Sequence, residues 1–160
     1  MSSEGGAAPA LDFDLDVAEL RATPSFTRAD LTLYGLLHAG SSYVLRIFFH
    51  APDAWPGTAC SQEAGYAGGV TLFGHGGCAG EDGHCHPRGP VTTFDRRPPH
   101  QLAPATKNLI CTEALRRALP AGDLLLVRIV PVLRTSPFVP PDAHANDVLT
   151  VPEIAIHTYL

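Results

Sequence analysis

The sequence predicts an all-β fold, an antiparallel β-sandwich or a jelly-roll-like barrel with one short helix and a long loop rich in glycine, histidine and cysteine. Three observations lead to this prediction. Several segments alternate apolar and polar residues with a period of two, which is typical of half-buried strands. The 160 residues include 15 glycines and 15 prolines, and both residue types break helices. A single segment carries the start and stop signals of a helix.

The first strand is predicted over residues 11–17, LDFDLDV. Its apolar side chains alternate with three aspartates, so one face of the strand would be buried and the other would face solvent. The preceding residues 1–10 are small and polar and are expected to form a flexible tail. The length suits a single domain over residues 11–160. The predicted buried face of the strand consists of Leu11, Phe13, Leu15 and Val17.

Six further segments are expected to be extended. The segment 123–133, DLLLVRIVPVL, is nearly continuously apolar and rich in β-branched residues, which indicates a central strand. Pro131 stands near its end, where a missing N–H disturbs the hydrogen-bond ladder least. Glycines weaken the strand pattern of residues 65–74. The other extended segments are 30–37, 42–50, 106–112 and 147–160.

The helix is predicted over residues 113–119, EALRRAL. The hydroxyl of Thr112 would cap it by accepting an N–H that the first turn leaves without a partner. Glu113 suits the positive end of the helix dipole, and two arginines suit the negative end. Pro120 and Gly122 would then end the helix.

The composition restricts the classes of function. The formal net charge is −5, which argues against a general binder of nucleic acids or membrane surfaces, because such a protein needs a basic face. The first residues show neither the basic nor the apolar region of a signal peptide, and no apolar run is long enough to span a bilayer. We therefore expect a cytoplasmic protein whose thiols are reduced.

The segment 73–89, FGHGGCAGEDGHCHPRG, concentrates thiols and imidazoles, the ligands that zinc and copper prefer. A short ligand pair, a glycine-rich turn and a second group of ligands form the general design of a small metal site. The spacing matches no standard zinc finger, because no second Cys-x-x-Cys or His-x-x-x-His pair follows. We expect copper or zinc. The first-choice ligands are His75, Cys78, His84 and Cys85, with His86 and His100 as reserves.

Other interpretations of these residues stay open. Cys78 and Cys85 would form a disulfide in an oxidising compartment, or remain unpaired thiols in a surface loop. Cys78 is also a candidate nucleophile, because a neighbouring imidazole lowers the pKa of a thiol. Cys111 stands in an apolar segment and is expected to be a core thiol, whereas Cys60 has no predicted partner. Structural roles are expected for the remaining histidines, which are His38, His50, His144 and His157.

Three stretches resemble a known family: YAGGVTLFGHGGCAGEDGHC, TTFDRRPPHQLAPATKNLICTEALRRAL and LLLVRIVPVL. Over residues 40–159 they look like the β-rich domain appended after the catalytic domain of bacterial tyrosinase-like proteins. They are more distantly similar to the C-terminal domain of plant polyphenol oxidases. Five candidate ligands fall within the family's motif, whereas His86 departs from it where the family leads us to expect an acidic residue. The five are His75, Cys78, His84, Cys85 and His100.

The resemblance implies a role beside an oxidative enzyme. Type-3 copper oxidases hold two coppers with six histidines on a helical bundle, and this sequence predicts no such bundle. In that family the appended domains shield the copper site or assist its maturation. The expected function is therefore a copper- or zinc-binding accessory protein with a tyrosinase-like enzyme as its partner. The alternatives are a small metalloenzyme with an open coordination position, and a non-catalytic interaction module whose loop is pinned by a disulfide.

Overall fold

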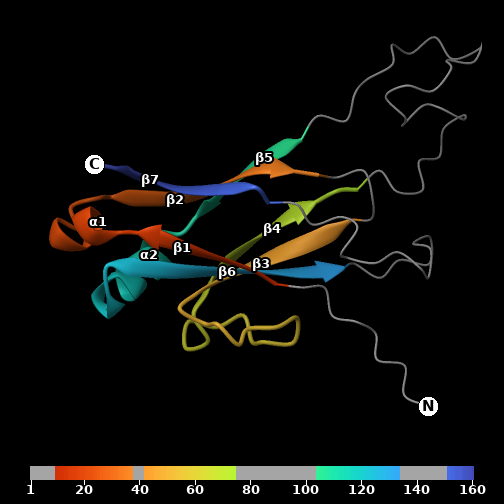
Figure 1. The fold of residues 1–160 in the computed structure, drawn as a ribbon, viewed down its shortest axis with the longest axis horizontal. Helices are drawn as coiled ribbons and strands as arrows, with labels where there is room; N and C mark the ends of the chain where they lie inside the picture. The colour runs from red at the N-terminus through yellow and green to blue at the C-terminus, as the bar shows by residue number, and fades with distance from the viewer. Residues whose placement is uncertain (1–9, 38–41, 75–103, 134–150) are drawn as a thin grey trace, which may run out of the picture.

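The computed structural model of the protein describes residues 10–37, 42–74, 104–133 and 151–160. These residues are mostly extended, which confirms the predicted all-β class (Figure 1). None of their helices is long and apolar enough to cross a bilayer. The elements in chain order are β1 (Leu11–Asp16), α1 (Ala18–Ala22), β2 (Arg28–Leu36), β3 (Tyr43–Phe49), β4 (Tyr66–Leu72), β5 (Ala105–Ile110), α2 (Thr112–Ala118), the 3-10 turn η1 (Leu119–Ala121), β6 (Leu124–Leu133) and β7 (Glu153–Tyr159).

The strands form two antiparallel sheets. One sheet has the order β1-β6-β3-β4 and the other the order β5-β2-β7. Figure 1 shows them as two layers, with the three-stranded sheet above the four-stranded one. In the described part of the chain, both sheets have unpaired edge strands. The structure is therefore the predicted β-sandwich and not a closed barrel.

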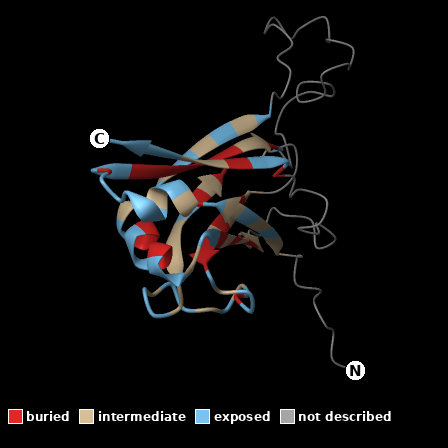
Figure 2. Cartoon of the chain, turned by 60° about the vertical axis from the view of Figure 1, so that its left-hand side comes forward, coloured by how far each residue is buried: buried red, intermediate tan, exposed pale blue. Residues whose placement is uncertain are grey.

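The main core lies between the sheets and includes the inner side of α2 (Figure 2). Fully burying one such aliphatic side chain contributes about 1.5–3 kcal/mol to stability. Side chains with no exposed surface come from both sheets and from α2, and they include Leu31 and Leu33 of β2, Leu45 and Ile47 of β3, Leu125, Val127 and Ile129 of β6, and Leu115 of α2.

The alternation predicted for the first strand is confirmed. The apolar residues of β1 are half-buried against the core, and its aspartates are exposed. One of these aspartates, Asp12, accepts hydrogen bonds at 2.9 and 2.7 Å from Arg128 of the neighbouring β6. The strand ends at Asp16, and a short helix that the sequence did not predict, α1, follows the buried Val17.

The central position predicted for residues 123–133 is also confirmed, since β6 pairs with β1 on one side and β3 on the other. The pairing with β1 begins at Leu124 and stops at Ile129. Pro131 lies beyond that point, opposite Leu45 of β3, so it stands where β6 has one neighbour instead of two. A proline is tolerated there because the ladder on the β1 side has already ended.

The helix forms where it was predicted, but Thr112 does not cap it. The N-cap residue is Cys111, and no side chain caps the helix. The hydroxyl of Thr112 instead accepts a hydrogen bond from the backbone N–H of Ala29 in β2, at 3.0 Å. The Thr112 hydroxyl is therefore used in a contact between α2 and β2, and not in the helix cap that the neighbouring residues predicted.

Candidate functional site

The residues predicted to bind a metal lie outside the described residues; these are His75, Cys78, His84, Cys85, His86 and His100. Within the described ranges, no group of three or more His, Cys, Asp or Glu side chains is arranged to hold a metal ion. The structure does define where the chain enters and leaves the segment 75–103. It leaves β4 after Leu72 and enters β5 at Ala105.

Six strand ends meet at one end of the sandwich, which we call the connection end. In the four-stranded sheet, Tyr43 pairs with both Leu72 and Leu133. In the other sheet, Leu36 pairs with Ala105, and Tyr34 with Glu153. In Figure 1 these ends lie on the right. The connection end consists of Leu36, Tyr43, Leu72, Ala105, Leu133 and Glu153.

Two hydrogen bonds fix the chain at the connection end. The hydroxyl of Tyr43 donates to the carbonyl oxygen of Leu37 at 2.8 Å. The backbone N–H of Gly74 donates to the hydroxyl of Ser42 at 3.0 Å. Beside these anchors, two large apolar side chains face solvent, Leu37 with 42% of its surface exposed and Phe73 with 73%. Hydrogen bonds therefore tie the chain at the connection end, and large exposed apolar side chains lie next to it.

Two predicted structural histidines, His38 and His144, lie outside the described residues, and the other two can be placed. His157 in β7 is exposed, and its Nε2 lies 3.1 Å from the hydroxyl of Tyr34 in β2. His50 follows β3 with a positive φ of 51°, which is uncommon for a residue with a side chain. Because it is exposed, His50 is available to line a surface hollow.

The two described cysteines differ in environment. Cys111 is buried, as predicted, and desolvation by burial raises the pKa of its thiol to about 11. Cys60 is exposed and also free. A buried thiol with a raised pKa is a poor nucleophile and a poor metal ligand, so Cys111 is a core residue.

An ion pair joins two residues of β2 in the three-stranded sheet. Two nitrogens of Arg28 each donate a 2.7 Å hydrogen bond to a different carboxylate oxygen of Asp30. The guanidinium also lies 5.5 Å from the ring centre of Tyr159. The hydrogen bond from Arg28 lowers the pKa of Asp30, although desolvation opposes the shift. Arg28 and Asp30 stand two residues apart in β2, whereas Tyr159 comes from the neighbouring β7, so only the contact with the ring depends on the tertiary structure.

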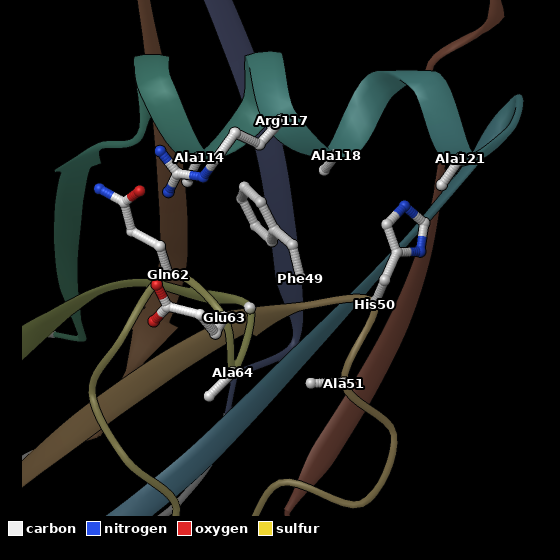
Figure 3. Close-up of a pocket in the computed structure, with 11 residues that line it drawn as sticks. Phe49, His50, Ala51, Gln62, Glu63, Ala64, Ala114, Arg117, Ala118 and Ala121 are labelled. Atoms are coloured by element: carbon white, nitrogen blue, oxygen red, sulfur yellow. The ribbon is translucent and has the colours of Figure 1, made fainter.

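A hollow of about 380 Å³ lies between α2 and the turn that precedes β4 (Figure 3). A neighbouring hollow of about 350 Å³ shares Gln62, Ala114 and Arg117 with it. Phe49 and His50 also line the first hollow. It lies at the far end of β3 from Tyr43, away from the connection end. No motif marks these residues in the sequence, because three separate segments contribute them.

Comparison with known proteins gives a fold and no closer assignment. No family model matches the chain, and no curated protein matches it. Among solved structures, the chain is similar to a latent aurone synthase (polyphenol oxidase) from natural source, with a TM-score of 0.52 and 16% identity over 96% of this chain. Recombinantly expressed latent aurone synthase (polyphenol oxidase) gives a TM-score of 0.51 and 16% identity over 93% of this chain.

The matched part is a minor portion of those proteins, 26% of the first chain and 24% of the second. At this level of identity the likeness concerns the fold. The class defined by fold and comparison is thus an open two-sheet β-structure like one portion of a polyphenol oxidase. The resemblance noted in the sequence is supported to this extent.

Proposed function

We propose that the chain is an accessory domain that packs through its connection end against a tyrosinase-like copper enzyme and shields the active site of that enzyme. The observation that carries the proposal is the fold likeness to a portion of a polyphenol oxidase described as latent. A fold found as one portion of a larger oxidase suits a partner of such an enzyme better than a stand-alone catalyst. As part of this proposal, the chain is located in the cytoplasm, where its thiols are reduced.

The connection end is the surface we assign to the contact. The exposed side chains of Leu37 and Phe73 lie next to it in the chain, and buried aromatic anchors dominate the energetics of many interfaces. The segment 75–103 is joined to the sandwich at this end, between β4 and β5. A partner that docks here would therefore contact the end of the sandwich from which the segment with the candidate ligands departs.

We further propose that His75, Cys78, His84 and Cys85 bind copper or zinc, with His86 and His100 as reserves. Thiolate and neutral imidazole are a donor set suited to zinc and to reduced copper. A closed four-ligand site would favour metal transfer or a structural role. An open site would favour the alternative, a small metalloenzyme in its own right.

The shielding role is tested with a tyrosinase-like enzyme that lacks a C-terminal domain. We expect the purified chain to slow oxidation of an o-diphenol by this enzyme in a saturable way. Changing Phe73→Asp or Leu37→Asp should weaken the inhibition by about ten-fold or more, because a charge would be buried at the contact.

A matched control comes from the opposite end of the sandwich. Leu124 is 60% exposed and stands at the start of β6, where it pairs with Asp16. The change Leu124→Asp should leave the inhibition intact. No inhibition at any concentration, or equal loss with Leu124→Asp and Phe73→Asp, would overturn the proposal.

A further inference from the structure

The hollow beside α2 has walls of different chemical character. One wall consists of α2 and the turn η1, with the small side chains of Ala114 and Ala118 from α2 and of Ala121 from η1. Between the walls lies the ring of Phe49, which is 4% exposed and belongs to the core cluster. Figure 3 shows this ring between Arg117 on one side and His50 on the other. The small alanine side chains leave apolar space over the ring.

The opposite wall is a turn held by its own hydrogen bonds. The N–H of Gly65 donates to the carbonyl oxygen of Gln62 at 3.0 Å, and the N–H of Tyr66 donates to that of Ser61 at 3.0 Å. The N–H of Phe49 donates to the carbonyl oxygen of Gly65 at 2.8 Å, which ties the turn to β3. These bonds hold the backbone of the turn that carries Glu63.

Two opposite charges face the hollow without forming an ion pair. Glu63 accepts hydrogen bonds from its own backbone N–H and from Ser61, and these lower the pKa of its carboxyl, so it is ionised at neutral pH. Arg117 forms no ion pair within the described part of the chain. The preceding Arg116, in contrast, pairs with Glu113 at 2.6 Å and donates to the carbonyl oxygen of Phe26 at 2.8 Å.

We propose that this hollow binds a small zwitterion, an α-amino acid with an apolar side chain. Its carboxylate would pair with Arg117, its ammonium group with Glu63, and its side chain would lie over Phe49 and the alanines of α2. An anion alone would be repelled by Glu63, and a cation alone by Arg117, whereas a zwitterion matches both charges. The volume of about 380 Å³ lies within the range of small-molecule sites.

Three probes that share one apolar body test the proposal. L-Phenylalanine carries both charges, 3-phenylpropionate lacks the ammonium group, and 2-phenylethylamine lacks the carboxylate. We expect L-phenylalanine to shift the backbone amide signals of residues 62–65 and 114–121 on titration. Each singly charged probe should bind more weakly than L-phenylalanine by at least about ten-fold, because it loses a charge-assisted hydrogen bond.

Charge variants separate the two ends of the ligand. The change Arg117→Gln should reduce the affinity for L-phenylalanine and 3-phenylpropionate and leave that for 2-phenylethylamine unchanged or higher. The change Glu63→Gln should reduce the affinity for L-phenylalanine and 2-phenylethylamine and leave that for 3-phenylpropionate unchanged or higher. Arg21→Gln is the matched control, because Arg21 is exposed and pairs with Asp123 outside the hollow. If an arginine variant fails to fold, Ala121→Leu at the exposed rim should still block binding by filling space.

The proposal is overturned if L-phenylalanine causes no shift at the hollow, if all three probes bind equally, or if Arg21→Gln weakens binding as much as Arg117→Gln. The hollow and the connection end lie at opposite ends of β3, so this result is independent of the shielding experiment.

Discussion

The hydroxyl of Tyr43, in β3 of the four-stranded sheet, donates a 2.8 Å hydrogen bond to the carbonyl oxygen of Leu37, which follows β2 of the other sheet. The side chain of Tyr43 is 1% exposed, and burial raises the pKa of its phenol to about 12. This partly buried hydrogen bond therefore links the two layers at the connection end.

Removing this hydroxyl should loosen the link without emptying the core. We expect Tyr43→Phe to lower the free energy of unfolding by about 1 kcal/mol, the net contribution of a typical internal hydrogen bond. Urea denaturation measures the loss. Tyr159→Phe makes the same chemical change at a half-exposed position and should have a much smaller effect. Equal effects would argue against a stabilising role for the bond.

The Arg28–Asp30 pair predicts a specific pH dependence. The folded state lowers the pKa of Asp30 from its ordinary 3.8, so the pair stabilises the fold above that pH. As the pH falls below about 3.8 and through the folded pKa, Asp30 is protonated and its contribution is lost. The cost of Asp30→Asn should therefore be greatest at neutral pH and should shrink in acid. Unfolding curves of this variant and of the exposed Asp14→Asn across that range provide the measurement, and a constant cost would contradict the assignment.

Gly35 is a position that no other residue suits. Its φ is +69°, and a Cβ atom there would lie 2.5 Å from the Cγ of Pro152. We expect Gly35→Ala to cost about 1–3 kcal/mol through backbone strain, with the clash adding to it. Gly122→Ala is the control, because Gly122 is extended and a Cβ atom added there would meet no other atom within 4 Å. A thermal melt that shows similar losses for both variants would refute this explanation.

Thiol reactivity tests the proposed metal ligands. In the native protein we expect the exposed Cys60 to react quickly with an alkylating reagent and the buried Cys111 to react slowly. Cys78 and Cys85 should be protected until a chelator removes the metal. Mass spectrometry of the alkylated peptides, with metal analysis of the same sample, distinguishes the four cysteines.

Two outcomes of that experiment would contradict metal ligation. Equal reaction of Cys78 and Cys85 with and without chelator would show that no metal protects them. Reaction only after a disulfide reductant would instead support the disulfide-pinned alternative. The double change Cys78→Ser, Cys85→Ser should abolish bound copper or zinc if the proposal holds.

Several elements were predictable because their signals are local. The alternation in β1, the continuous apolar run of β6 and the stop signals after α2 each reflect neighbours along the chain. Other features were not predicted because they depend on residues far apart in the sequence. Thr112 bonds to Ala29, 83 positions away, so a capping rule based on adjacent residues assigned its hydroxyl wrongly. The hollow beside α2 was not predictable either, because its lining residues come from separate segments of the chain.

The sequence by itself determined that the segments of β1, β3 and β6 are extended and that the segment of α2 is helical, because hydrophobic periodicity and helix-end preferences act over a few residues. Only the tertiary structure decided that the strands divide into two open sheets and that six strand ends meet at the connection end. It also placed Arg117 and Glu63 around one hollow. Such arrangements depend on which apolar faces bury one another across long chain separations, and no local pattern encodes that choice.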